Sequence, residues 1–238
     1  MKRLALIIGI MFFVLVLQAK TYIVCVGIND YPGTRNDLRV SANDAVTIAN
    51  IFAKNNHAEG SYYTNQDATI SNVVNDMSKV FTKANTNDVV IFFFSGHGIP
   101  GGLVCYDGYL YYNKVFQTMS QCKAKNKVVI ADACFSGKMR STRKRNHNDS
   151  NINAMLFLSS RSNEMSMEMP QQTGFYNSLF TTYLERGLRG GADTNNDRTI
   201  TAKELYDYVH NGVVKYSGGR QHPVMWGKFD GNMPLIKW

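Results

Sequence analysis

The sequence predicts an α/β fold in which a mostly parallel sheet carries helices on both faces. Two short apolar runs, Val89–Phe94 and Val128–Ala131, have no polar residue at alternate positions, which is typical of strands buried on both faces. Segments with apolar residues three and four apart lie between such runs and predict helices. A chain of 238 residues that is 44% hydrophobic suits one domain with a single large core.

The first half of the chain begins with a predicted strand at Thr21–Ile28, which is followed by a loop rich in turn-forming residues. A helix is predicted at Ala42–Lys54 and a weaker strand at Ser61–Thr64. The next helix begins after a cap at Asp67 or Thr69. Its apolar face carries Val73, Val74, Met77, Val80 and Phe81.

The second half continues this alternation. Asp107-Gly108 predicts a small hairpin within Leu103–Leu110. Two polar segments without periodicity, Lys138–Ser150 and Arg161–Thr173, are predicted to be loops. The remaining elements are a helix at Asn113–Cys122, a buried strand at Ala154–Ser159, and helices at Tyr176–Leu188 and Thr201–Lys215.

The N-terminus has the pattern of a secretory signal peptide. Basic residues at positions 2 and 3 precede the apolar run Leu4–Leu17, which is closed by Gln18-Ala19. The run is shorter than the about 20 residues of a membrane-spanning helix. We therefore predict a signal peptide at residues 1–19 and an exported domain, periplasmic or secreted, at 20–238. An uncleaved membrane anchor is the alternative.

Charge and cysteine content narrow the partners and cofactors. The formal net charge of +8 indicates solubility, and because no recognition motif accompanies it we predict no nucleic-acid partner and no membrane contact except through the leader. Cys25 is predicted to be a buried small hydrophobe. The spacing of Cys105 and Cys122 leaves open whether they pair in an oxidising compartment. No C-x-x-C pair is present, which disfavours a structural zinc site.

Both long apolar runs end in residues that can carry chemistry. Ser95-Gly96-His97-Gly98 ends the first run, and Asp132-Ala133-Cys134-Phe135-Ser136-Gly137 ends the second. Sites in open α/β sheets lie at the carboxyl ends of the strands. If these strands are neighbours, His97 and Cys134 face each other, and a thiol beside an imidazole is an activated nucleophile. A core thiol and a structural histidine are the alternative.

These two motifs resemble the His and Cys motifs of caspase-like cysteine peptidases, and most closely those of metacaspases and bacterial caspase-like proteins. The resemblance covers nearly all the chain after residue 20, because Asn29-Asp30-Tyr31, Ser41–Ala45 and Gln221–Val224 are also similar to that family. It implies a caspase-like three-layer sandwich. It also implies that the chain is a cysteine endopeptidase.

Catalytic roles follow from the chemistry of the two motifs. A free cysteine is mostly protonated at neutral pH, so we assign Cys134 as nucleophile and His97 as the general acid and base that activates it. The backbone N–H groups of Cys134 and Gly98 are the expected oxyanion donors. Glycine suits position 98 because a side chain there would crowd the scissile bond.

Asp132 lies two residues before Cys134 and therefore points to the same side of the strand end. An acid there opposes ionisation of the thiol, and a cationic substrate side chain would offset this cost. The resemblance implies that Asp132 and Asp44 form the S1 pocket and that Ser95 and Ser41 match further pocket positions. Two acids favour Arg or Lys at P1. A helix cap or first-turn acid is the alternative role for Asp44.

The segment Asp193–Glu204 resembles an EF-hand calcium loop. Its candidate ligands are Asp193, Asn195, Asp197, Thr199 and Glu204. The segment departs from that motif at Arg198, where the sharp turn favours glycine. We prefer the alternative, a turn followed by an N-cap for the last helix, and we predict that no cofactor is required.

The leading hypothesis is an endopeptidase that cleaves protein or peptide substrates after Arg or Lys. One alternative is a catalytically silent caspase-like module that binds partners or calcium. Another is a legumain-like or transpeptidase enzyme with the same His/Cys plan. A basic P1 preference would also make the loop after Cys134 a substrate of the enzyme itself. Its basic residues are Lys138, Arg140, Arg143, Lys144 and Arg145. A solvated loop that is never cut is the alternative.

Overall fold

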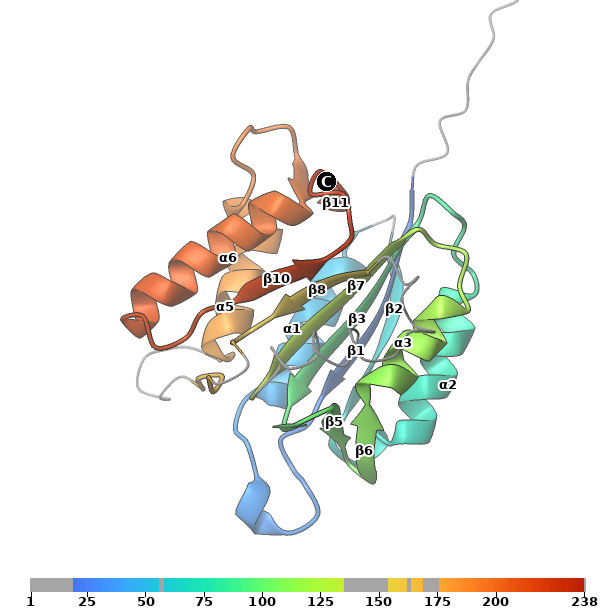
Figure 1. Ribbon diagram of the computed structural model, residues 1–238, viewed down its shortest axis with the longest axis vertical. Coiled ribbons are helices and arrows are strands. Elements are labelled where there is room, and N and C mark those ends of the chain that lie inside the picture. Colours follow the sequence, from blue (N-terminus) through green and yellow to red (C-terminus); the bar gives the residue numbers. More distant parts are fainter. Residues whose placement is uncertain (1–18, 56–57, 135–153, 162–163, 169–175, 238) are drawn as a thin grey trace, which may run out of the picture.

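A six-stranded sheet forms the centre of the molecule, in the order β10-β8-β7-β3-β1-β2 (Figure 1). The computed structural model describes residues 19–55, 58–134, 154–161, 164–168 and 176–237. Five strands are parallel and β10 is antiparallel, so the mostly parallel sheet is confirmed. The strands are β1 (Thr21–Gly27), β2 (Ala58–Thr64), β3 (Val89–Gly96), β7 (Asn126–Ala133), β8 (Ala154–Leu158) and β10 (Val224–Gly227).

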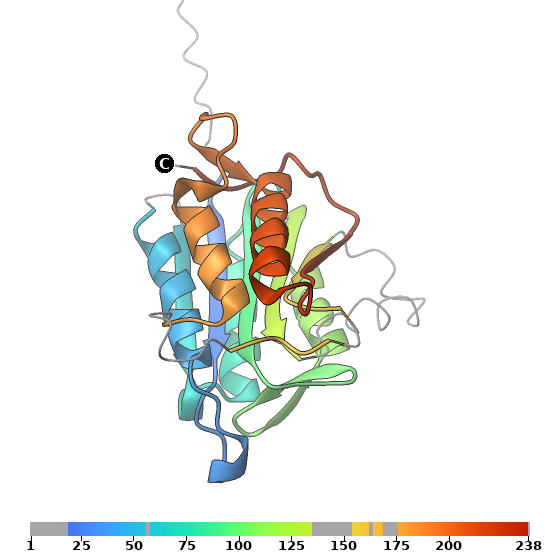
Figure 2. The ribbon, with the colours of Figure 1, turned by 90° about the vertical axis from the view of Figure 1, so that its left-hand side faces the viewer.

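Helices cover both faces of this sheet and complete three layers (Figures 1 and 2). One face carries α1 (Ser41–Ala53), α5 (Leu179–Arg186) and α6 (Ala202–Ser217), and the other carries α2 (Ile70–Phe81) and α3 (Tyr112–Ser120). Three shorter helical turns occur in the connections. They are η1 (Thr34–Asn36), η2 (Asn65–Asp67) and η6 (Gly187–Gly191).

Burial on both faces explains why the central strands have no alternating pattern. In β3, Phe92 and Phe94 are 0% exposed and pack with α2 and α3. Ile91 and Phe93 are also 0% exposed, but they point to the opposite face and pack with α1, α5 and α6. Each residue of the strand thus has an apolar environment, as expected for a parallel sheet between two helical layers.

Two smaller sheets flank the central one. The predicted hairpin at Asp107-Gly108 is confirmed, because β5 (Gly102–Cys105) and β6 (Gly108–Tyr111) pair antiparallel around it. The short strand β4 (Gly98–Ile99) directly follows His97 and pairs with β5. Elsewhere β11 (Pro234–Lys237) pairs with β9 (Thr199–Thr201). We did not predict β4, β9, β10 or β11, all of which are four residues or shorter.

Side-chain caps determine where several helices begin. Thr69, not Asp67, caps α2 by accepting a hydrogen bond from the Asn72 N–H. The helix predicted from Tyr176 begins only at Leu179, because Ser178 caps it by accepting from the Thr181 N–H. This places the N-terminus of α5 beside the strand ends.

Some predictions concern residues that the structure does not describe, and others concern membrane-spanning helices and cysteine pairing. The leader residues 1–18 and the basic loop at 138–150 are among the residues that are not described. Within the described ranges, no helix has the length and apolar character needed to cross a membrane. Cys25, Cys105, Cys122 and Cys134 carry free thiols, so the structure contains no bond between Cys105 and Cys122.

Candidate active site

The ends of β3 and β7 bring His97 and Cys134 together. The two strands are parallel neighbours, with Ser95 opposite Asp132 and Gly96 opposite Ala133. His97 and Cys134 are the next residues along each strand. They line one cavity of about 80 Å³ at this carboxyl edge of the sheet. Other residues around the cavity are Leu38, Ser41, Ser95, Gly96, Asp132, Ala133, Ser166, Met167, Glu168 and Ser178.

Gly98 touches the backbone of the candidate nucleophile. A side-chain carbon at position 98 would lie 2.3 Å from the carbonyl oxygen of Cys134, far inside a normal contact. The two residues whose N–H groups we predicted as oxyanion donors are therefore neighbours. Glycine is required at position 98 by the structure itself and not only by the space that a substrate needs. Any larger residue there would push the two strand ends apart.

The imidazole of His97 is held by a backbone carbonyl. Its Nε2 lies 2.6 Å from the carbonyl oxygen of Asn36, in the loop between β1 and α1. A carbonyl oxygen only accepts, so Nε2 carries the proton of this hydrogen bond. In the neutral ring Nδ1 is then unprotonated and is the atom that can accept a proton from a thiol. The Tyr31 ring packs on the imidazole with centroids 4.8 Å apart.

Asp132 lies in the wall of the cavity and accepts hydrogen bonds from three hydroxyl groups. The Thr181 hydroxyl donates at 3.2 Å, and the hydroxyls of Ser166 and Ser178 donate to the two carboxylate oxygens at shorter range. The side chain is 4% exposed. Burial raises the pKa of Asp132 and these hydroxyl donors oppose the rise.

Asp44 lies deeper than Asp132 and does not itself line the cavity. The residue is 0% exposed, in the first turn of α1, and its carboxylate accepts from the Ser95 hydroxyl at 2.7 Å and the Ser178 N–H at 3.0 Å. Burial raises the pKa of Asp44 well above its usual value, and the charge of Asp132 adds to the rise. Asp44 is thus a first-turn acid, but its hydrogen bonds are to β3 and α5, not to its own helix.

The two acids share an environment rich in hydrogen-bond donors, to which the described residues contribute no paired cation. Ser178 joins them, because its N–H donates to Asp44 and its hydroxyl to Asp132. The N-terminal end of α5, which begins at Leu179, therefore points at both carboxylates and favours negative charge there. Among the described residues, no Lys, Arg or His side chain forms an ion pair with either acid.

The C-terminal segment supports the far wall of the cavity. Gln221 is 0% exposed, and its Oε1 accepts from the Met167 N–H at 3.0 Å. Its Nε2 donates to the Ser159 carbonyl at 2.9 Å and to the Ser166 hydroxyl at 3.3 Å. Next to it, His222 contacts Glu164 through Nδ1 at 3.0 Å. The part of the cavity wall formed by residues 166–168 is therefore held in place by hydrogen bonds from the tail.

A family model of the caspase domain matches residues 2–232 of this chain. The chain belongs to the caspase-domain family. A protein from Geobacter sulfurreducens, known from a crystal structure, has the same fold, with a TM-score of 0.64 over 87% of this chain and 92% of that one. The two are 18% identical, so this likeness concerns the fold alone. No curated protein sequence matches the chain.

Membership of this family identifies a cysteine peptidase as the class of activity to expect from the caspase domain. The fold puts the predicted residues in one place: His97, Cys134, Gly98, Asp132, Ser95 and Ser41 all lie at the same edge of the sheet. Asp44 lies behind them.

Sequence reasoning did not find several residues of this site. The Asn36 carbonyl leaves no signal, because any residue type supplies a carbonyl. Ser166 lies in a segment without periodicity, far from the two motifs in sequence. Gln221 stands in a stretch that resembles the family, but the sequence assigned no role to its side chain. Ser178 was within reach, because a serine directly before an amphipathic run is a helix N-cap signal.

The predicted calcium loop of the caspase domain is closed by its own hydrogen bonds. The Asp193 carboxylate accepts from the N–H groups of Asp197 and Arg198. Glu204 accepts from Thr201 and Thr194, and with Thr201 it forms a capping box at the start of α6. In the described ranges, no three His, Cys, Asp or Glu side chains are grouped to hold a metal ion. The predicted turn and the N-cap of α6 at Thr201 are thus both present.

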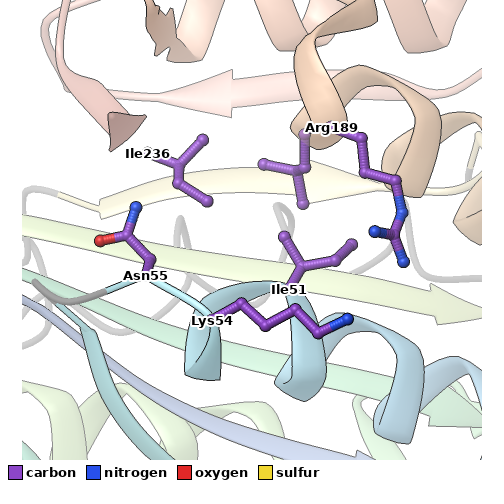
Figure 3. A pocket seen from close by; sticks show the side chains of 6 residues that line it. Ile51, Lys54, Asn55, Arg189 and Ile236 are labelled. Carbon is purple, nitrogen blue, oxygen red and sulfur yellow. The ribbon is translucent and has the colours of Figure 1, made fainter. Parts of the chain in front are cut away.

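A larger cavity of about 430 Å³ lies beside the C-terminal end of α1 (Figure 3). Ile51, Lys54 and Asn55 at the end of α1 line it together with Arg189 and Ile236. It contains neither a thiol nor an imidazole, and Arg189 is paired with Glu185. The candidate nucleophile and base therefore line the smaller of these two cavities.

Proposed function

We propose that this caspase domain is a cysteine endopeptidase that cleaves peptide bonds after Arg or Lys. One observation carries the proposal: a cavity that holds both His97 and Cys134 also holds a buried carboxylate, Asp132, that has no cationic partner among the described residues. The substrates are proteins or peptides that present a basic side chain to that acid.

In the proposed reaction, Nδ1 of His97 takes the proton of the Cys134 thiol, and the thiolate attacks the substrate carbonyl carbon. The negative oxygen that results is held by the N–H groups of Cys134 and Gly98. His97 then gives its proton to the departing amine, which leaves an acyl group on the sulfur. Water hydrolyses this thioester and restores both residues, so the chain supplies each proton transfer itself.

Electrostatic balance supports the basic specificity. The two buried carboxylates have no ion-pair partner among the described residues, so they repel each other and are poorly solvated. The hydroxyls of Ser166 and Ser178 offset this only in part. A guanidinium or ammonium group that enters beside Asp132 supplies the missing charge. The planar guanidinium of Arg can also form two parallel hydrogen bonds with the carboxylate. Acidic P1 residues would add a third negative charge.

A panel of fluorogenic peptides that differ only at P1 tests this proposal. We expect turnover with Arg and Lys, little with a neutral residue and none with Asp. Cys134→Ala and His97→Ala should each reduce turnover to background while circular dichroism shows an intact fold. Because no step needs a metal, rates in EDTA and in CaCl₂ should be equal. Wild-type turnover by either variant, or a preference for Asp, contradicts the proposal.

Self-processing is a second part of the proposal. The basic loop after Cys134 lies outside the described residues, and its sequence offers five cleavage points: Lys138, Arg140, Arg143, Lys144 and Arg145. We expect purified wild-type protein to be cut slowly after one of them, while Cys134→Ala stays a single chain. Intact-mass measurement over time decides this. A wild-type chain that stays whole, or equal cleavage of the variant, contradicts self-processing in this loop.

The proposed enzyme acts after export. This rests only on the leader-like sequence of residues 1–19, which has the order of a signal peptide. N-terminal sequencing of protein recovered from the periplasm or the medium tests it, and Lys20 is the expected first residue.

A further inference from the structure

The backbone of His97 is fixed by a tyrosine hydroxyl that the proposed reaction does not otherwise use. The N–H of His97 donates to the Tyr31 hydroxyl at 2.9 Å, and that hydroxyl donates in turn to the Val104 carbonyl at 3.2 Å. The Val104 N–H donates back to the His97 carbonyl at 2.9 Å. Tyr31 and Val104 together thus hold both backbone polar groups of His97.

The same tyrosine packs closely around the strand end. Its ring lies 4.8 Å from the imidazole, centroid to centroid, and the residue is 5% exposed. A side-chain carbon at Gly96 would lie 2.6 Å from the Tyr31 hydroxyl, so the hydroxyl occupies the space beside the glycine that precedes His97. Burial raises the pKa of Tyr31, which keeps the hydroxyl protonated and able to donate.

The loop that carries Tyr31 is held in place by hydrogen bonds to two side chains. The Asn65 side chain, at the end of β2, accepts from the N–H groups of Asn29 at 2.9 Å and Asp30 at 3.2 Å. The N–H of Tyr31 donates to the Asp37 carboxylate at 3.2 Å. The loop that presents the Tyr31 hydroxyl to the His97 backbone therefore also presents the Asn36 carbonyl to the His97 ring.

We propose that Tyr31 is a positioning residue for catalysis, which fixes the backbone and ring of His97 through its bridging hydroxyl and through its ring, which packs against the imidazole at a tilt of 40°. The expected loss of kcat rests on the proposed function, whereas the positioning of the His97 imidazole by Tyr31 does not. The Asn36 carbonyl sets which nitrogen carries the proton, and Tyr31 sets where the imidazole lies. A base held at one place transfers a proton faster than one that moves, and a displacement of about 1 Å costs roughly 100-fold in rate.

The test uses Tyr31→Phe, which keeps the ring and removes the bridging hydroxyl. We expect kcat to fall roughly 10- to 100-fold while KM for an Arg peptide changes less than about twofold, because the hydroxyl does not touch the cavity's carboxylate. Iodoacetamide labelling of Cys134 should slow toward the rate of His97→Ala. Labelling does not require peptide hydrolysis, so it tests the positioning even if the wild type cleaves no peptide.

Tyr112→Phe is the matched control. The Tyr112 hydroxyl is also buried, but it has no hydrogen-bond partner among the described residues. Its loss should leave kcat and Cys134 labelling unchanged. Cys25, Cys105 and Cys122 are buried thiols that report folding in the same mass spectrum, because they become labelled only if the chain opens.

Wild-type kcat and wild-type Cys134 labelling in Tyr31→Phe overturn the proposal, as does a change confined to KM. If that variant labels at the three buried cysteines and is therefore unfolded, Asn65→Gly decides. Glycine accepts the positive φ of 48° at position 65 and removes the amide that holds the loop. A fall in kcat in the folded Asn65→Gly variant then supports the positioning role, and an unchanged kcat overturns it.

Discussion

At the scale of single residues, the carboxylate of Asp132 should determine specificity. We expect Asp132→Asn to lower kcat/KM for Arg peptides by about 2–5 kcal/mol of transition-state binding, because a buried cation would lose its charged partner. The amide keeps the shape of the side chain and can still bond with the hydroxyls of Ser166 and Ser178. Folding should therefore be preserved.

The matched control for this change is Glu168→Gln. Glu168 lines the same cavity, but its Oε1 accepts from the Arg39 N–H at 2.8 Å, a bond that glutamine can also make. We expect this variant to lose less than tenfold in kcat/KM for Arg peptides. Peptide assays with both variants, and with a neutral P1 residue for comparison, measure the effect. An equal loss in the two variants would contradict the assignment of the P1 contact to Asp132.

Three of the predicted site residues stand at the ends of strongly apolar strands, whereas Ser41 and Asp44 lie in α1 and were assigned from the family resemblance. His97, Cys134 and Asp132 follow directly from that position, since the carboxyl ends of parallel strands meet at one edge. Asn36 and Gln221 belong to irregular segments. Their contribution depends on how long connections fold back, which local pattern does not encode.

At the scale of elements, the turn before α6 contains a strained residue. Arg198 has φ of 63°, in the left-handed region, and stands where the calcium-loop pattern favours glycine. Its N–H donates to Asp193 at 3.0 Å, which keeps the backbone in this conformation. The calcium-loop pattern thus correctly indicated a sharp turn at position 198, although the Asp193 carboxylate accepts hydrogen bonds from the backbone of its own loop.

Two substitutions at this position should have opposite effects on stability. Arg198→Gly removes the left-handed strain and should raise the free energy of unfolding by about 0.5–1 kcal/mol, after the greater freedom of glycine in the unfolded chain is subtracted. Arg198→Val should lower it by about 1 kcal/mol or more, because a branched side chain tolerates this φ poorly. Urea denaturation of both variants measures the difference. Two changes of the same sign would show that backbone strain is not the cause.

Long elements were predicted well and short ones were not. The apolar spacing of α1, α2 and α6 spans at least three turns each and places them within a few residues of their observed bounds. The edge strand β10 has four residues, and no pattern of period two develops over Val224–Gly227. Its pairing with β8 comes from the return of the tail across the sheet, a tertiary effect.

At the scale of the whole molecule, the two buried acids should reduce stability in exchange for binding. Asp44→Asn removes one of two repelling charges but keeps an oxygen for the Ser178 N–H and an NH₂ group for the Ser95 hydroxyl. We expect its free energy of unfolding at pH 7 to be about 1 kcal/mol higher than that of the wild type. Cleavage after Arg should become weaker at the same time.

The pH dependence of this difference has a definite sign. Burial raises the pKa of Asp44 in the folded state above its value of about 3.9 in an unfolded chain. The folded wild type therefore binds a proton more tightly than the unfolded chain, and it gains stability from this group as the pH falls through the folded-state pKa. The advantage of Asp44→Asn should shrink from pH 7 toward pH 4. An advantage that grows with acidity would show that Asp44 is stabilised as an anion.

The buried amide of Gln221 makes the proposed substrate pocket depend on a segment that is synthesised late. The ribosome synthesises the His97 and Cys134 motifs, Asp44 and most of the sheet well before it synthesises the tail. The segment that carries Ser166 and Met167, however, is held in place by hydrogen bonds with Gln221 in that tail. A nascent chain would thus contain His97 and Cys134 long before the proposed substrate pocket is complete. The proposed peptidase activity would therefore arise only after the segment that carries Gln221 has been synthesised, and an incomplete chain would not cleave proteins of the cell that makes it.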